Sequence, residues 1–260
     1  MSTLSTLPEP DVLLRQLAGK YAVDVPGAWR LANRADAAAA GTMTLVPGWA
    51  VWAREPSEAL LPLLPWRSER RFVELKRMVE ERTVESVAMC RFSCTTDGRT
   101  MDLPAVLYRE FDLAEWLAGS PIAAVTASIE AGRWANVIVR LANGVVCGIE
   151  VGVTLPAGAA TMDRHELIAR RGVACDRVVD SQVAQDSIYT FTAAGARQYT
   201  DVDAELFGPA AEEVSLVRAA YEILLHPARA DALRRQHGRL CGLVRLALES
   251  DQRRQRLSAT

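Results

Sequence analysis

The segment LYREFDLAEWL places three reactive side chains in a row, Tyr108, Arg109 and Glu110, with the carboxylate of Asp102 shortly before them. A phenol or a carboxylate at these positions could carry a proton during catalysis. Arg109 could not, because an arginine pKa above about 12 keeps the guanidinium charged at neutral pH. Its planar fork suits the binding of a carboxylate or a phosphate through two hydrogen bonds. The segment therefore predicts an anion clamp beside candidate proton carriers. The alternative is that Arg109 pairs at the surface with Glu110 or Asp102.

Other patterns that carry chemistry are missing from the sequence. There is no G-x-G-x-x-G, no G-x-x-x-x-G-K-[ST], no G-x-S-x-G and no H-E-x-x-H. The histidines His165, His226 and His237 lie far apart along the chain, which favours a structural role for each. Five cysteines without a C-x-x-C pair indicate buried thiols rather than a zinc site or a disulfide framework. We therefore expect neither a metal nor a cofactor.

Composition and charge narrow the class of protein. The chain has 260 residues, of which 50% are apolar, so it can bury a substantial core. Its 30 basic and 32 acidic side chains give a formal net charge of -2 and are mixed along the sequence, which argues against nucleic acid or a membrane surface as partner. No apolar run reaches the roughly 18 residues of a spanning helix, and the N-terminus lacks a signal-peptide pattern. We expect a cytoplasmic protein.

The first quarter of the chain alternates between strand and helix patterns, which favours parallel pairing. The predicted elements are a helix at 11–18, a brief buried strand at 21–25, an Ala-rich helix at 29–39 and a strand plus turn at 42–52. The stretch EPSEALLPLLPW contains three prolines, so it cannot be one uninterrupted helix and marks a connection. The pattern predicts a domain boundary near residue 65.

After residue 65 the helical period gives way to a period of two. Helices are predicted at 68–81, 107–117, 210–225 and 228–249, and strands at 87–93, 122–130, 135–141, 145–153, 165–179 and 186–191. These patterns predict an α+β fold with an open, mainly antiparallel sheet and helices on one face. In the strand from Val145 to Val153 the odd positions are apolar, while Gly148, Glu150 and Gly152 share a flat, small second face. That face could be solvated or covered by another subunit.

Several segments, taken in order, resemble the glucose-fructose oxidoreductase and inositol dehydrogenase (Gfo/Idh/MocA) family. They are GKYAVDVPGAW at 19–29, WRSERRFVELKRMV at 66–79, LYREFDLAEWLAGSPIAAVTA at 107–127 and ANGVVCGIEVGVT at 142–154. The resemblance implies a dinucleotide-binding domain followed by an α/β domain whose open sheet commonly forms the oligomer interface. On this basis residues 1–65 look like a truncated remnant of a Rossmann-type domain, and residues 66–260 look like the C-terminal domain.

The sequence departs from the family at the positions that carry its chemistry. The family's glycine fingerprint precedes the segment that here begins at Gly19, and its Glu-Lys-Pro corresponds to Asp24-Val25-Pro26. In the second signature, the family's aspartate aligns with Ala105 and its histidine with Arg109. The resemblance thus implies that NAD(P) binding and the catalytic lysine and histidine are lost. Arg67 aligns with an arginine common in the family and could line the former cleft or simply face water.

Three functions remain open at this point. The first is a non-redox pseudoenzyme that assembles through its sheet face with itself or with a full-length oxidoreductase. The second is an NAD-independent lyase, isomerase or cyclase acting on a small polar metabolite, with Tyr108, Glu110 or Asp102 as proton carrier and with Arg109 and Arg67 binding the substrate. The third is a redox subunit that borrows a cofactor domain from a partner chain.

Overall fold

The computed structural model describes residues 9–34, 41–54, 57–99, 101–176, 187–192, 195–200 and 211–259. The chain divides into two compact units. One comprises Met1–Glu69 with Val202–Gly238, and the other comprises Arg70–Asp201 with Arg239–Thr260. No helix in the described ranges is long and apolar enough to cross a membrane.

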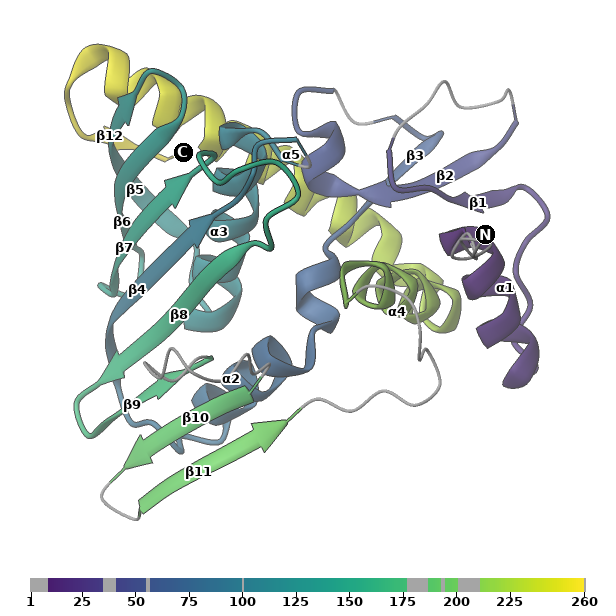
Figure 1. The fold of residues 1–260 in the computed structure, drawn as a ribbon, viewed down its shortest axis with the longest axis horizontal. Coiled ribbons are helices and arrows are strands. Elements are labelled where there is room, and N and C mark those ends of the chain that lie inside the picture. The colour runs from purple at the N-terminus through teal and green to yellow at the C-terminus, as the bar shows by residue number, and fades with distance from the viewer. Residues whose placement is uncertain are drawn as a thin grey trace, which may run out of the picture. The chain divides into compact units, whose positions relative to one another are not determined.

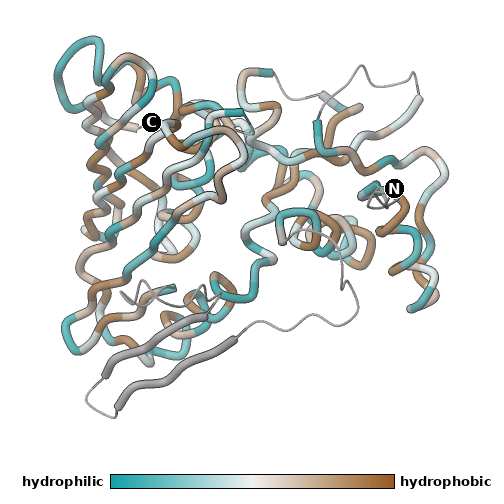
Figure 2. The backbone as a smooth tube through the Cα atoms, in the orientation of Figure 1, coloured by the Kyte–Doolittle hydropathy of each residue, from teal (hydrophilic) through white to brown (hydrophobic). Residues whose placement is uncertain are grey.

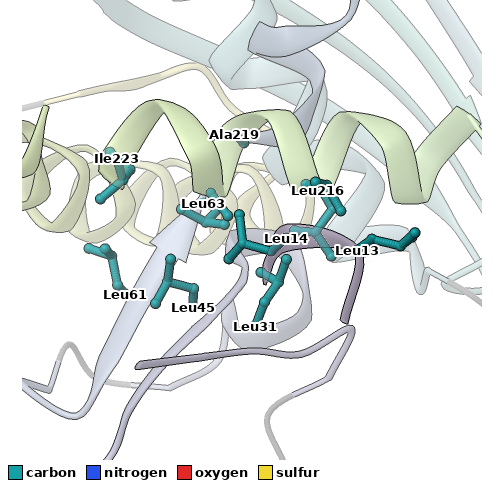
Figure 3. Packing of buried hydrophobic residues seen from close by; sticks show 11 residues of the cluster. Leu13, Leu14, Leu31, Leu45, Leu61, Leu63, Leu216, Ala219 and Ile223 are labelled. Carbon is teal, nitrogen blue, oxygen red and sulfur yellow. The ribbon is translucent and has the colours of Figure 1, made fainter. Parts of the chain in front are cut away.

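The first unit is built on a small parallel sheet (Figure 1). Its strands, in spatial order, are β1 (Trp29–Leu31), β2 (Met43–Pro47) and β3 (Leu60–Leu63). The helices are α1 (Pro10–Lys20), α4 (Ala211–Leu225) and the 3-10 turns η1 (Gly48–Val51), η2 (Pro65–Ser68) and η3 (Pro227–Arg229). Leucines from α1 and the strands pack against α4, as Figure 3 shows for Leu14, Leu31, Leu45, Leu63 and Leu216. The parallel pairing expected for this part of the chain is confirmed.

Two predicted elements of the first unit are wrong. The stretch 21–25 is not a strand: residues 21–22 form a turn, in which Ala22 takes a left-handed conformation with φ 54° directly after α1 ends, and residues 23–25 have no regular secondary structure. The start of the predicted helix at 29–39 is instead β1, whose pairing with β2 and whose buried Leu31 override the local helical preference. Residues 35–39 of that prediction lie outside the described residues.

The second unit contains a nine-stranded sheet in the order β11-β10-β9-β8-β4-β7-β6-β5-β12. The strands are β4 (Val87–Thr95), β5 (Ile122–Glu130), β6 (Trp134–Leu141), β7 (Val146–Gly152), β8 (Met162–Ala169), β9 (Gly172–Cys175), β10 (Ser187–Thr192), β11 (Gly195–Thr200) and β12 (Leu257–Ser258). All neighbours pair antiparallel except β4 and β7, which are parallel. The predicted α+β class with a mainly antiparallel sheet is confirmed.

The helices of the second unit agree largely with the sequence. They are α2 (Arg70–Glu80), α3 (Leu103–Ala118) and α5 (Ala230–Arg253), the last of which is shared between the two units. Helix α3 begins four residues earlier than predicted, because Asp102 caps it by accepting a hydrogen bond from the Ala105 amide at 2.8 Å. The predicted strand at 165–179 is a hairpin of β8 and β9, and its residues 177–179 lie outside the described part.

The large sheet has one buried and one exposed face. Buried and exposed residues alternate along β6, and Figure 2 shows hydrophobic and hydrophilic residues alternating along the strands of the large sheet. Helix α3 contacts β4, β5, β6 and β7, whose inward side chains form the core. We call the opposite side the open face. It is not flat and small as predicted, because it carries five exposed large side chains: Met89, Trp134, Ile138, Val146 and Met162. The Trp134 ring also fills the space over Gly152, where an added Cβ would lie 2.7 Å from it.

Candidate functional site

Six ionisable side chains from three elements and one loop position of the second unit meet on the buried side of the large sheet. They are Arg71 of α2, Arg109 and Glu110 of α3, Asp163 and His165 of β8, and Asp176, which directly follows β9. The side chains of Glu110, His165 and Asp176 are fully buried, and those of Arg109 and Arg71 are 9% and 13% exposed. We call this set the charge ring.

His165 lies between two carboxylates. Its Nδ1 is 2.7 Å from Oδ2 of Asp176, and its Nε2 is 2.9 Å from Oε2 of Glu110. Asp176 also accepts the His165 backbone N–H at 2.6 Å. Burial alone would lower the pKa of His165, but the charges of Asp176 and Glu110 outweigh it and raise the pKa to about 9. The imidazole is therefore doubly protonated at neutral pH and donates to both acids. The rings of Phe72 and Phe92 pack edge-on against it at 4.8 and 4.9 Å.

Asp163 is held by two arginines. Arg71 binds it with both terminal nitrogens, each at 2.8 Å, and Arg109 Nη2 donates to its Oδ2 at 2.7 Å. Burial would raise the pKa of Asp163, but the two guanidinium groups keep it well below its usual range. The remaining contacts link the two halves of the network. Arg109 Nη1 donates to Oε1 of Glu110 at 2.9 Å, and Arg71 Nη1 donates to Oδ2 of Asp176 at 3.1 Å.

These contacts close into a ring in which cations and anions alternate. Its order is Arg71, Asp163, Arg109, Glu110, His165, Asp176 and back to Arg71. With His165 protonated the ring holds three positive and three negative charges, so no net charge is buried. Each ion touches two partners of opposite sign, which offsets the cost of removing it from water. The ring joins both helices to β8 and β9, and a histidine with a pKa near 9 is a poor general base at neutral pH.

The predicted site residues are divided among different environments. Arg109 and Glu110 meet in the ring, so the expected pairing of these two occurs, but it is buried rather than at the surface. Tyr108 is fully buried, and Asp102 is the exposed cap of α3. Arg67 lies in η2 of the other unit. The roles proposed for these residues in catalysis and substrate binding stay predictions.

The sequence analysis placed none of four residues in the ring: Arg71, Asp163 and Asp176, which it did not single out, and His165, for which it favoured a structural role. A signal for two of them exists in β8, where the strand period directs Asp163 and His165 to the same buried face. An acid and a histidine on a core-facing strand need charged partners. The partners themselves come from segments up to 105 residues away, as in the Arg71–Asp176 pair.

Neither the metal-binding residue types nor the cysteines form a metal site or a disulfide in the part of the chain that the structure describes. No group of three or more His, Cys, Asp and Glu side chains there could hold a metal ion. All five cysteines are buried and free, as the sequence indicated. Burial raises the pKa of Cys94, although Arg109, whose Nη1 lies 3.4 Å from its Sγ, acts in the opposite direction.

No protein-family model and no curated sequence matches this chain. Several solved structures do. An oxidoreductase domain protein from Kribbella flavida is 12% identical with a TM-score of 0.70, over 97% of this chain and 84% of its own. Levoglucosan dehydrogenase, solved with NADH and levoglucosan, is 12% identical with a TM-score of 0.65, over 86% and 75%. An oxidoreductase from Agrobacterium radiobacter, solved with NAD+, L-tartaric acid and magnesium, is 13% identical with a TM-score of 0.62, over 84% and 73%.

Identities this low establish a shared fold. The resemblance noted in the sequence is confirmed at that level. This chain has the fold of the Gfo/Idh/MocA-type oxidoreductases.

Proposed function

We propose that this chain is a non-redox relative of these oxidoreductases that serves as an assembly subunit, with the open face of its large sheet as the interface. The observation that carries the proposal is the apolar character of that face. Five of the nine large hydrophobic side chains that are exposed in the described chain lie on it. Clustered apolar surface of this kind marks an interaction site in a folded protein.

Two of the large apolar side chains on the open face lie opposite glycines of the neighbouring strand. In the register of β6 and β7, Trp134 lies opposite Gly152 and Ile138 opposite Gly148, so the glycines leave each large side chain accessible from above. Ile138 is 54% exposed and Trp134 47% exposed. Covering such surface contributes roughly 25 cal/mol per Å² removed from water. Removing this apolar surface from water would therefore stabilise an assembly formed through the open face.

The edge of the same sheet at β5 offers no comparable site. The amide of Ala127 donates to Ser250 Oγ at 3.0 Å, and the amide of Ile129 donates to Asp251 Oδ1 at 2.8 Å. Nearer the start of β5, strand β12 pairs with Ala124 and Val125. Because these backbone groups are occupied, a strand from another chain cannot pair directly with β5. This observation favours association through the face.

The state of Arg109 supports the non-redox part of the proposal. This residue aligns with the family's catalytic histidine, and a guanidinium cannot exchange protons at neutral pH. Its two terminal nitrogens bind Glu110 and Asp163. An anionic substrate would have to displace one of these acids, which weakens the alternative of an enzyme that grips its substrate through Arg109.

Size-exclusion chromatography with light scattering tests the proposal. We expect the wild-type chain to form an oligomer or to co-purify with a partner from its native host. Ile138→Glu should shift it towards the monomer, because a charge would be buried in the interface. Val73→Glu is the matched control, since Val73 is a β-branched residue on α2 that is 39% exposed. A wild-type chain that is strictly monomeric and carries no partner would contradict the proposal, and so would an Ile138→Glu variant with unchanged assembly.

A further inference from the structure

Two of the buried cysteines lie side by side in the large sheet. Cys90 on β4 and Cys147 on β7 are directly paired in the parallel register of these strands, and both side chains are fully buried. Their thiols are within hydrogen-bonding reach of each other, and Sγ of Cys147 also lies 3.8 Å from the carbonyl oxygen of Gly148. The two sulfur atoms are thus neighbours on the buried side of the sheet, where neither belongs to the charge ring or to the open face.

The other three cysteines have different surroundings. Cys94 lies four residues further along β4, on the same face and only 1% exposed, but the residue opposite it on β7 is Val151. Cys175 on β9 has Glu166 opposite it on β8, and Cys241 lies on α5. Among the five cysteines, all of which the structure describes, the strand register places only Cys90 and Cys147 opposite each other.

The spacing of paired strands is close to that of a disulfide. Neighbouring strands lie about 4.7–4.9 Å apart, whereas bonded cysteines have Cα atoms about 4.4–6.8 Å apart and Cβ atoms about 3.5–4.5 Å apart. A bond between Cys90 and Cys147 therefore requires their Cβ atoms to approach each other by about 1 Å. This contraction strains the bond, and a strained disulfide is readily reduced again.

We propose that Cys90 and Cys147 form an oxidative modification site, at which a disulfide of low molecular weight links β4 to β7 and an excess of thiol reverses the link. One cysteine, once ionised, attacks a sulfur of the small disulfide and releases half of it as a thiol. The second cysteine then displaces the other half from the mixed disulfide. The two cysteines together lose two electrons and two protons, and the small disulfide is reduced to two thiols.

The bond acts on the parallel strand pair at the centre of the large sheet. The chain runs from β4 to β7 through α3, β5 and β6, so a link between Cys90 and Cys147 closes this connection into a loop and restrains the unfolded chain. Burial, together with the neighbouring Cys90 thiol, raises the pKa of Cys147 well above its ordinary value. Since the thiolate is the attacking form, oxidation requires this part of the sheet to open locally. We therefore expect the native chain to be oxidised slowly.

Peptide mapping of the native protein tests the proposal. The chain is incubated with oxidised glutathione, the remaining thiols are alkylated in denaturant after an acid quench, and trypsin then cleaves at Arg91, which separates Cys90 from Cys94. We expect one disulfide-linked pair of peptides, carrying Cys90 and Cys147, with the other three cysteines alkylated. An excess of reduced glutathione should remove the link. Far-UV circular dichroism should not change on oxidation, because the strands move little.

Single variants and an unfolded sample complete the test. Cys90→Ala and Cys147→Ala should each abolish the link, while Cys94→Ala, the matched control on the same strand face, should retain it. Oxidation in urea shows that the reagent is active, and it should give mixed cysteine pairs.

The proposal is overturned if the native wild-type chain forms no Cys90–Cys147 link although the unfolded chain is oxidised. It is also overturned if the link appears only with a loss of secondary structure or alongside equal amounts of other pairs, because the native register would then not direct it. None of these outcomes changes the proposed assembly function, since both thiols lie on the buried side of the sheet.

Discussion

At the scale of single residues, Arg109 is the side chain that links sequence and structure. The sequence alignment places Arg109 where the family has a catalytic histidine. That position suggests either that a proton carrier has been lost or that the arginine binds an anion. In the folded chain it neutralises Asp163 and Glu110 inside the charge ring. Its charge therefore serves the stability of the second unit, and His165, the one histidine in the ring, is held between acids rather than presented to a ligand.

Replacing Arg109 by methionine should destabilise the second unit by about 3–5 kcal/mol, because it leaves two buried carboxylates without one of their cations. Urea unfolding followed by circular dichroism measures this. Arg91→Met is the matched control, since Arg91 is 60% exposed and its pair with Glu166 should contribute less than about 1 kcal/mol. Equal, small effects of both changes would show that the ring does not stabilise the fold.

The pKa of His165 predicts how stability depends on pH. The group titrates near pH 9 when folded and near its ordinary 6.5 when unfolded, so the folded state binds the proton more tightly. Its contribution is complete below about pH 6.5 and is lost as the pH rises from there through about 9. The free energy of unfolding should fall by a few kcal/mol over this range. His165→Gln should abolish that slope in urea titrations, and an unchanged slope would place the titrating group elsewhere.

At the scale of elements, side chains of helices satisfy the edges of both sheets. In the first unit, α1 performs this role for β1. Arg15 Nη2 donates to the Trp29 carbonyl at 2.8 Å, and Asp11 Oδ1 accepts the Leu31 amide at 2.9 Å. The two side chains also pair with each other at 2.8 Å. An acid and an arginine one helical turn apart thus supply the donor and the acceptor that a neighbouring strand would offer.

Asp11→Ala should therefore destabilise the first unit by about 1–3 kcal/mol, because the Leu31 amide loses its partner in a buried setting. Asp11→Asn retains a carbonyl acceptor and should cost less. Thermal unfolding gives the stability, and hydrogen exchange at the Leu31 amide reports the contact itself. Asp231→Ala serves as control, since that carboxylate is 78% exposed in its pair with Arg234. Fast exchange at Leu31 already in the wild type would argue against a closed edge.

At the scale of the whole molecule, the chain shares its fold with oxidoreductases, two of which were solved with NAD+ or NADH. Solved structures that are 12–13% identical to the chain superpose on most of it, so the same topology forms although most side chains differ. Function does not follow from such likeness, because activity depends on the groups at a site. In this chain Arg109 and Glu110 belong to a buried ionic network, and the open face is the surface that we propose to act in assembly.

The sequence alone determined the elements whose signal is local. Helix α2, strands β5 and β6, and the terminal helices α4 and α5 appear where the hydrophobic period predicts them. The alternation in β7 also predicted which side of the sheet is buried. These features depend on contacts between residues close together in the chain, so a single segment carries the information.

Only the tertiary structure decided the rest. The three residues of β1 become a strand through pairing with β2, and β4 pairs parallel with β7 although more than forty residues separate them. The charge ring joins α2 to Asp176 across 105 residues, and no local pattern in either segment identifies the other as its partner. A buried charge predicts that a partner exists, because burying an isolated ion in the interior costs too much free energy. Which residue becomes that partner depends on how the helices dock on the sheet.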